Sequence, residues 1–273
     1  MPLSQKDEAL VQLFMAGCHH RWDDLTEMGQ TCYSAGCSVP EVRGCIRHLI
    51  VAAGYTTCLA AGSRLLAAQL LPVDTPGKVS GPPGNAFELV FDKVAPAVRN
   101  QLHQVDPVLG AYISRHAYGD VYSSPGISLR QKELLMCAYL GQANMSDQLF
   151  SHIYAAMRFG SDREACEQAM DIGFQRSDAN KDEPVEMALR QLDMAAFKMV
   201  REFPKGAPEE PEIELLDSSC VCIPELEDAP IRSSGRKTKS GGKSWAAKLT
   251  PILTGYYSDV DAGLGGLGGL PTP

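Results

Sequence analysis

Apolar residues recur at helical spacing through most of residues 5–203, with polar residues between them. No β-branched run alternates with polar residues between hairpin turns, which is the pattern that favours a strand. Three segments fit a capping box, in which two side chains satisfy the free backbone donors of a first helical turn. They are Ser38 to Glu41, Ser128 to Gln131, and Ser161 to Glu164. The pattern therefore predicts an all-α fold.

The same pattern predicts two related repeats. Residues 24–42 align with residues 148–166 when one extra residue is allowed after Gly36, so that Gly36 matches Gly160 and Met28 falls on His152. A stretch rich in proline and glycine separates the copies and is typical of a linker. We therefore expect a degenerate first repeat over 1–72, a linker over 73–85 and a second repeat over 86–203.

The composition changes completely at Pro204. Residues 208–230 are acidic, residues 232–248 are basic and rich in serine and glycine, and the last residues show no helical or strand period. Such a segment cannot bury enough apolar surface to fold alone. Residues 204–273 are therefore predicted to be a long, irregular, low-complexity tail. It is either a solvated extension or a segment that becomes ordered on partner subunits.

Composition narrows the class of protein. Hydrophobic residues make up 44% of the chain and charged residues 21%, which is ordinary for a soluble globular protein. The net charge of −8 argues against a nucleic-acid partner, because phosphate binding needs a basic face. No apolar run approaches the roughly 18 residues that favour a membrane span, and the N-terminus has no secretory or transit character. We expect a soluble intracellular protein, in the cytoplasm or in an organelle matrix such as that of a mitochondrion or plastid.

The nine cysteines are an odd number with no regular spacing, which favours reduced thiols over a disulfide framework. Cys220 and Cys222 have no second pair to complete a zinc site. Cys18, His19 and His20 are metal-ligating residue types, but adjacent histidines on a helix face different directions and no fourth ligand is near. We expect neither a metal nor a cofactor.

His152 is the first candidate for chemistry, because it shares an otherwise apolar helix face with Leu149 and Ala156. Glu133 lies 19 residues upstream, near the start of the preceding predicted helix, so packing of the two helices could bring the groups together. A carboxylate beside an imidazole fixes its tautomer and suits general acid–base work. The alternatives are a core histidine and a glutamate that favours a helix N-terminus.

The segment HAYGDVYSSPGIS, from His116 to Ser128, together with residues 128–173 resembles the carboxymuconolactone decarboxylase family, which includes alkylhydroperoxidase D-type enzymes. The resemblance implies an alkylhydroperoxidase D-like helical array in a cyclic oligomer. It also implies a functional glutamate and histidine at the separation of Glu133 and His152. The redox cysteines of the peroxidase branch are replaced by Met145 and Gln148, so thiol peroxidase chemistry has no nucleophile.

The decarboxylase branch needs no cysteine, and its glycine–tyrosine turn is matched by Tyr118, Gly119 and Asp120. Where its members typically have an arginine before the proline, this chain has Ser124, which cannot grip a substrate carboxylate in the same way. Two hypotheses follow. The first is a cofactor-free lyase acting on a small lactone or carboxylic acid, with His152 as general acid and base, Glu133 orienting it and Tyr118 assisting. The second is a pseudoenzyme that serves as a structural subunit of a large assembly.

Overall fold

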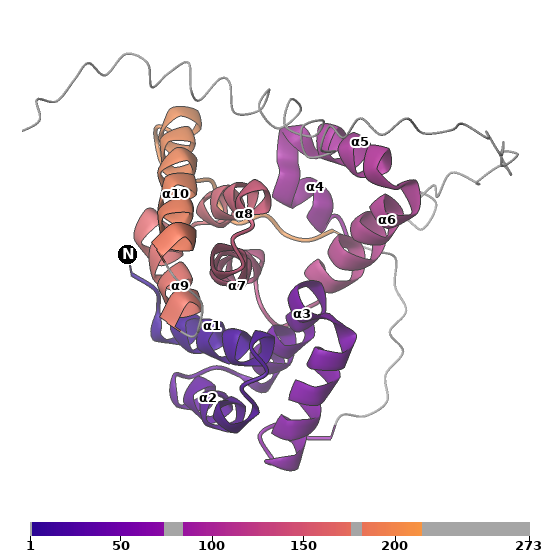
Figure 1. The fold of residues 1–273 in the computed structure, drawn as a ribbon, viewed down its shortest axis with the longest axis vertical. Coiled ribbons are helices and arrows are strands. Elements are labelled where there is room, and N and C mark those ends of the chain that lie inside the picture. The colour runs from indigo at the N-terminus through magenta and orange to yellow at the C-terminus, as the bar shows by residue number, and fades with distance from the viewer. Residues whose placement is uncertain (1, 74–83, 176–181, 215–273) are drawn as a thin grey trace, which may run out of the picture. The chain divides into compact units, whose positions relative to one another are not determined.

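The computed structural model of the chain describes residues 2–73, 84–175 and 182–214 (Figure 1). Every secondary-structure element of these residues is a helix, so the all-α prediction is confirmed. The helices are α1 (Gln5–Cys18), α2 (Trp22–Ser34), α3 (Val39–Ala67), α4 (Ala86–Phe91), η1 (Asp92–Val94), α5 (Ala95–Val105), α6 (Pro107–Tyr112), η2 (Ile113–Tyr122), α7 (Leu129–Gln142), α8 (Ser146–Arg158), α9 (Arg163–Gln175) and α10 (Asp182–Glu202).

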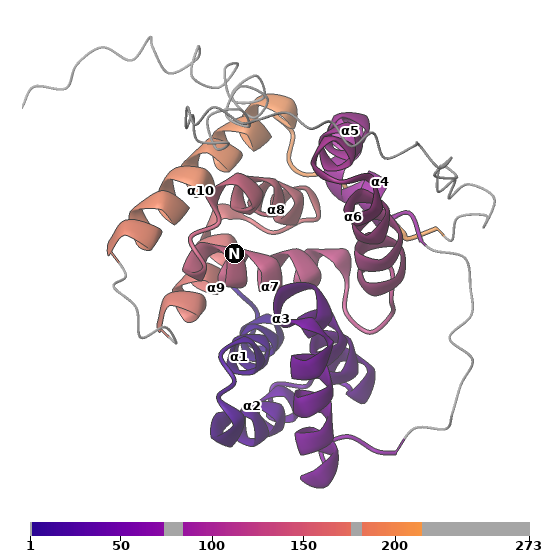
Figure 2. The same cartoon turned by 45° about the vertical axis from the view of Figure 1, so that its right-hand side comes forward.

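Helix α7 is at the centre of this arrangement. Figure 1 looks nearly along its axis, and Figure 2 shows it between α8 on one side and α1 on the other. Its strongest packing is against α8 and α9, and it also contacts α1, α3 and α10. Ten of its fourteen residues are buried, on all sides of the helix. A helix that is buried all round is the core of its domain, so α7 holds whatever it bears in a fixed position.

Helices α1 to α3 and helices α7 to α9 follow the same local plan. Each bound of α1, α2 and the start of α3 lies 124 residues before its counterpart, as Gln5 and Leu129 illustrate. The connections match as well, because Gly36 and Gly160 both have a positive φ, 85° and 96°. Glycine adopts this left-handed conformation without steric cost and so ends both preceding helices.

This constant separation corrects two details of the sequence analysis. Helix α9 begins at Arg163 because the Asp162 carboxylate accepts from the backbone N–H of Ala165 at 2.9 Å. The predicted cap at Ser161 is therefore wrong by one residue, and the Ser161 hydroxyl is buried without a partner. The extra residue placed after Gly36 is wrong for the same reason, since Ser38 and Asp162 occupy equivalent cap positions.

The expected turn at Tyr118–Asp120 is also wrong. These residues belong to η2, a ten-residue π-helix whose wider hydrogen-bond spacing continues in the bond from the Ser123 N–H to the Tyr118 carbonyl at 3.1 Å. The chain turns only afterwards, around Gly126, where the helix has ended. Because π-helical segments re-aim side chains and recur at functional sites, this feature places the two tyrosines of η2.

Helix α3 is the one helix of the described residues whose length and composition would allow it to cross a membrane, which is weak support for insertion. Its backbone is kinked at Gly54, where φ is 81° and ψ is 172°. Each half of the helix is shorter than the roughly 18 residues that a span needs. The half after the kink exposes Tyr55, Leu59 and Leu66.

The start of the predicted tail lies on the helices. The Glu210 carboxylate accepts from the backbone N–H of Arg130, in the first turn of α7, at 3.0 Å. Asn85 and Glu214 exchange two hydrogen bonds of 2.9 Å each. A carboxylate at a helix N-terminus is favourable because it meets free N–H groups and the positive end of the helix dipole. The predicted features of residues 215–273 lie outside the described residues.

The close approach of α9 to α7 depends on Gly173, and this gives a first prediction. A Cβ at Gly173 would lie 2.3 Å from the carbonyl oxygen of Ala138, which is backbone and cannot move aside. We expect Gly173→Ala to lower the free energy of unfolding by about 1–3 kcal/mol through overpacking, measured by urea unfolding. Gly62→Ala, whose Cβ would make only an ordinary 3.8 Å contact, is the control and should be neutral or stabilising. Equal effects of the two substitutions would contradict this account.

Candidate acid–base site

Glu133 and His152 are brought together between α7 and α8. The Glu133 Oε2 atom lies 2.6 Å from Nδ1 of His152. The Glu133 side chain is fully buried, whereas the imidazole keeps 9% exposure. The capping box of Ser128 and Gln131 starts α7 and so places Glu133 in its second turn. The sequence prediction that these two residues meet is confirmed by this distance.

The geometry defines how the imidazole can act. When Glu133 is ionised it accepts the proton on Nδ1, which leaves Nε2 as the unprotonated nitrogen of the ring. Because Nδ1 faces the buried carboxylate, any proton exchanged with a substrate has to pass through Nε2. The arrangement is a base held in one tautomer by a buried carboxylate, which is the geometry of general acid–base catalysis.

The hydroxyl beside this pair belongs to Tyr122, which the sequence analysis missed. Its oxygen lies 3.4 Å from Nδ1 of His152. The predicted residue, Tyr118, stacks on the Tyr122 ring at 4.6 Å between centroids. Tyr118 therefore belongs to the cluster as the packing partner of the tyrosine that reaches the histidine. Tyr122 is one helical turn beyond Tyr118 in the same motif, and that spacing was the signal that could have identified it.

Burial dominates the electrostatics of the cluster. Burial raises the pKa of Glu133, while the nearby His152, Lys132 and Arg158 act in the opposite direction. Burial, reinforced by the charge of Glu133, raises the pKa of Tyr118 and of Tyr122. The second Glu133 oxygen, Oε1, is buried without a hydrogen-bond partner. Such an atom is costly unless another group or a water reaches it, so the carboxylate depends on its bond to His152.

Lys132 fixes the tyrosine segment to α7. Its side chain is 1% exposed, and its Nζ donates to the carbonyl of Tyr122 and, at 2.7 Å, to the carbonyl of Ser124. Burial lowers the pKa of this lysine to about 8. The ammonium group thus caps the end of η2, and it anchors the backbone of Ser124 at the position where the family resemblance implies an arginine side chain.

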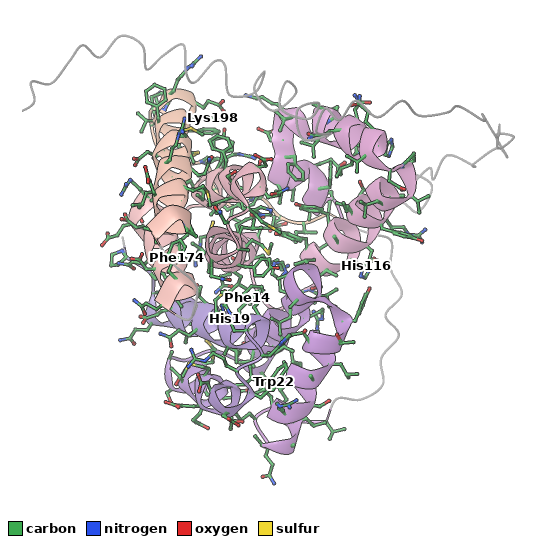
Figure 3. All side chains as sticks on the ribbon, in the orientation of Figure 1. Phe14, His19, Trp22, His116, Phe174 and Lys198 are labelled. Atoms are coloured by element: carbon green, nitrogen blue, oxygen red, sulfur yellow. The ribbon has the colours of Figure 1, made fainter. Side chains whose placement is uncertain are left out.

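His48 approaches Tyr122 from α3. Its ring makes an edge contact with the Tyr122 ring at 4.7 Å between centroids. It also packs against Phe14 of α1, which is labelled in Figure 3, at 5.9 Å between centroids. Both ring nitrogens are buried without a hydrogen-bond partner. Burial lowers the pKa of His48 well below its usual value. Only the packing of α3 brings His48 to Tyr122.

The other candidates do not join this site. Cys137 has no exposure and burial raises its pKa, as expected for a core thiol. His20 bonds to the Thr57 hydroxyl at 3.1 Å and stacks on Trp22, and no cluster suited to a metal ion occurs among the described residues. His116, labelled in Figure 3, pairs with Asp120 at 3.2 Å and with the Tyr55 hydroxyl on the surface. A groove of about 430 Å³ lined by residues of α3 and by residues 71–73 does not include the Glu133–His152 pair.

The sequence matches no model of a known protein family and no curated protein. The site is therefore defined by its own geometry, as a buried carboxylate–imidazole pair with an adjoining tyrosine in an all-helical protein.

The buried lysine gives a prediction about pH. Because the Lys132 pKa is about 8 in the folded protein and about 10.5 in the unfolded chain, the unfolded chain binds more protons between these values. Its contribution to stability should therefore increase as the pH rises from 8 to 10.5 and be lost again as the pH falls, by up to about 3 kcal/mol. We expect the free energy of unfolding of the wild type, minus that of Lys132→Met, to increase from pH 8 to pH 10.5. Urea unfolding of both proteins at each pH measures this difference. A difference that does not change with pH would show that the lysine is not perturbed.

Proposed function

We propose that the chain is a carboxymuconolactone decarboxylase-like protein that performs cofactor-free acid–base chemistry on a small lactone or carboxylic acid, as a lyase. The observation behind this proposal is the 2.6 Å contact between His152 and the fully buried Glu133. Removing a carboxylate from water costs several kcal/mol unless it is paired. A protein that needed only a filled core at this position would be at least as stable with apolar side chains.

In this proposal His152 is the group that moves a proton through Nε2. Glu133 is a positioning residue, since it acts on the substrate only through the imidazole. Tyr122 places its hydroxyl 3.4 Å from Nδ1, at the same edge of the ring as Glu133, so it too is a positioning residue, and Tyr118 assists by packing against it at 4.6 Å. Proton transfer to a developing enolate by an imidazole in this role contributes about 10²- to 10⁴-fold to the rate. His48 and Lys132 hold Tyr122 from two other sides.

The proposal includes an alkylhydroperoxidase D-like fold that arose by internal duplication. The constant separation of 124 residues between the bounds of α1–α2 and α7–α8 supports it. At this separation Ala9 is equivalent to Glu133, and Met28 is equivalent to His152. The first copy therefore has neither group of the pair, and each chain has one site.

A panel of small lactones and the corresponding ring-opened carboxylic acids, followed by NMR, tests this function. We expect turnover by the wild type and a loss of about 10²- to 10⁴-fold in kcat/KM for His152→Ala. Glu133→Gln should lower the rate and change its pH profile, because the carboxylate sets the tautomer and basicity of the imidazole. Tyr122→Phe should cost more than Tyr118→Phe.

His103→Ala, in α5 and outside the cluster, is the matched histidine control and should retain wild-type rates. Urea unfolding of each variant separates loss of chemistry from loss of structure. Equal turnover by His152→Ala and the wild type would overturn the acid–base role.

A specific observation favours a second function, in which the chain is a catalytically degenerate structural subunit of a larger intracellular assembly. The second half of α3 leaves Tyr55, Leu59 and Leu66 exposed by 61%, 72% and 44%. Leu59 and Leu66 also line the groove of about 430 Å³ on α3. Clustered apolar exposure of this kind marks surfaces that contact other proteins. The C-terminal anchoring that belongs to this hypothesis falls mostly outside the described residues.

The assembly function predicts a dependence of native mass on α3. We expect Leu59→Glu in the full chain to lower the native mass, measured by light scattering, because a buried charge at a subunit contact is strongly unfavourable. Val200→Glu on α10 is the control, since Val200 is also 72% exposed. A native mass that is the same for both variants and the wild type would exclude this surface as a subunit contact.

A further inference from the structure

Two cysteines meet where α2 ends. The backbone N–H of Cys37 donates to the carbonyl of Cys32 at 2.8 Å, across the left-handed residue Gly36. This is the six-to-one bond of a Schellman motif, which brings the side chains of its first and last residues together. Here both side chains are thiols that reach carbonyls one turn apart on α1, because the Cys32 sulfur meets the Ala9 carbonyl at 3.4 Å and the Cys37 sulfur meets the Lys6 carbonyl at 3.8 Å. A disulfide needs Cα atoms roughly 4.4–6.8 Å apart, and the 2.8 Å backbone bond holds the two residues close to each other.

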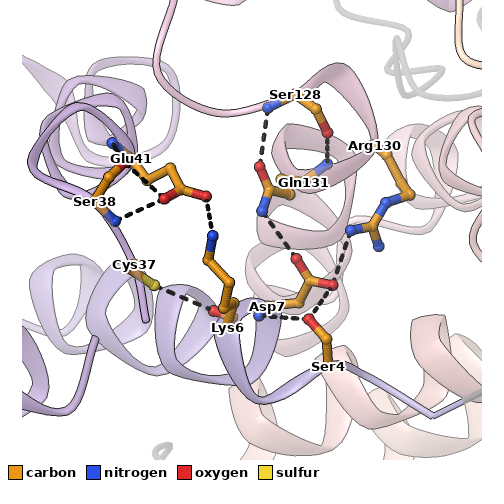
Figure 4. Close-up of polar contacts among 9 residues, drawn as sticks. All are labelled: Ser4, Lys6, Asp7, Cys37, Ser38, Glu41, Ser128, Arg130 and Gln131. Carbon is orange, nitrogen blue, oxygen red and sulfur yellow. Dashed lines mark hydrogen bonds and ion pairs between the residues drawn. The ribbon is translucent and has the colours of Figure 1, made fainter. Parts of the chain in front are cut away.

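Helix α1 lies against this thiol pair. The Cys37 thiol also donates to the carbonyl of Lys6 at 3.8 Å, and the Lys6 ammonium pairs with Glu41 at 2.7 Å (Figure 4). The Cys32 sulfur lies 3.4 Å from the Ala9 carbonyl oxygen. Cys32 has no exposure, whereas Cys37 keeps 5%. Cys37 is therefore the thiol of the pair that a small molecule in solution reaches first.

The charges divide the roles of the two thiols. The neighbouring Cys32 thiol lowers the pKa of Cys37, and Lys6 acts in the same direction against burial and the charges of Glu41 and Asp7. The neighbouring Cys37 thiol and burial raise the pKa of Cys32. A thiolate is the attacking form of cysteine, so Cys37 is the nucleophile and Cys32 the thiol that resolves the first product.

A second pair, Cys137 and Cys166, shows what this arrangement adds. These thiols also contact each other, but both have no exposure. Burial raises the pKa of Cys137. Contact alone is therefore present in both pairs, and access together with an activated thiol is present only at Cys37. The buried pair is a built-in control.

We propose that Cys32 and Cys37 form a reversible disulfide by exchange with a small-molecule disulfide. The Cys37 thiolate attacks one sulfur of the oxidant, the sulfur–sulfur bond of the oxidant breaks, and one thiolate leaves. Cys32 then loses its proton and attacks the Cys37 sulfur, which expels the second thiolate. One small disulfide is reduced to two thiols, and the two cysteines are oxidised together.

Oxidation changes the junction of α2 and α3. The disulfide removes the proton that Cys37 donates to the Lys6 carbonyl, and it holds the end of α2 to the residue just before the Ser38 cap of α3. Because Lys6 also pairs with Glu41 in the first turn of α3, the modification site lies within the contacts between α1 and α3. It is separate from the Glu133–His152 pair and does not depend on the function proposed above.

The test is equilibration of the full chain in mixtures of reduced and oxidised glutathione. After an acid quench, the chain is denatured and free thiols are alkylated, so that buried reduced thiols are labelled as well. Digestion after arginine yields residues 22–43 as one peptide that contains both cysteines and no other. As the mixture becomes oxidising, we expect both cysteines of this peptide to stop taking up the label together. The unlabelled peptide should then be lighter by two hydrogens than its dithiol form, as a disulfide requires. Cys137 and Cys166 should keep their labels. Full labelling of residues 22–43 in every mixture would overturn the proposal.

Two variants assign the roles. Cys32→Ala should accumulate a mixed disulfide between Cys37 and glutathione, because the resolving thiol is missing. Cys37→Ala should leave Cys32 labelled throughout. A mixed disulfide on Cys32 in the second variant would reverse the roles and contradict the proposal. The result for the wild type stands whether or not the variants fold, and circular dichroism reports their folding.

Discussion

The burial of an ionisable pair is the constraint on which the rest of the structure depends. Glu133 has no exposure and one of its oxygens has no partner, so its other oxygen must meet His152 within hydrogen-bond distance. That requirement fixes the separation and rotation of α7 and α8. Lys132 then ties the end of η2 to α7 through two backbone carbonyls, which places Tyr122 beside the imidazole. Two consecutive ionisable residues of α7, Lys132 and Glu133, thus place Tyr122 and His152 through hydrogen bonds that apolar packing alone would not supply.

The first helices complete this site although they have no such pair of their own. His48 of α3 packs on the Tyr122 ring, and Asp7 of α1 accepts bonds from Arg130 at 2.8 Å and Gln131 at 3.0 Å, at the start of α7 (Figure 4). The hydrogen bonds of Arg130, Gln131 and Ser4 lower the pKa of Asp7 against its burial. These helices therefore support the Glu133–His152 pair through packing and through hydrogen bonds at the start of α7.

Two kinds of polar burial coexist in this chain and serve different ends. In the Glu133–His152 pair the carboxylate is fully buried and occupies Nδ1, so the imidazole can act only through Nε2. The thiols at the end of α2 lie in a turn, where the neighbouring Cys32 thiol and the charge of Lys6 lower the pKa of Cys37. In both cases a residue with no exposure, Glu133 or Cys32, changes the acid–base properties of a neighbour that keeps some exposure. These neighbours are His152 and Cys37. The protein therefore has two candidate reactive groups on separate elements.

The sequence by itself determined the helical class and the starts of α3 and α7, because capping boxes and helical spacing are local signals. It offered the meeting of Glu133 with His152 as one of several alternatives, and the packing of α8 on α7 decided it. It misplaced the cap of α9 by one residue, since Ser161 and Asp162 are both competent caps and only the end of α8 chooses between them. The family resemblance of Tyr118–Asp120 gave the tyrosine role to Tyr118, whereas the π-helix η2, which the sequence analysis did not predict, places Tyr122 beside His152. The approach of His48 to Tyr122 and the contact of Cys32 with Cys37 were decided by tertiary structure, because each depends on how one helix packs or ends against another.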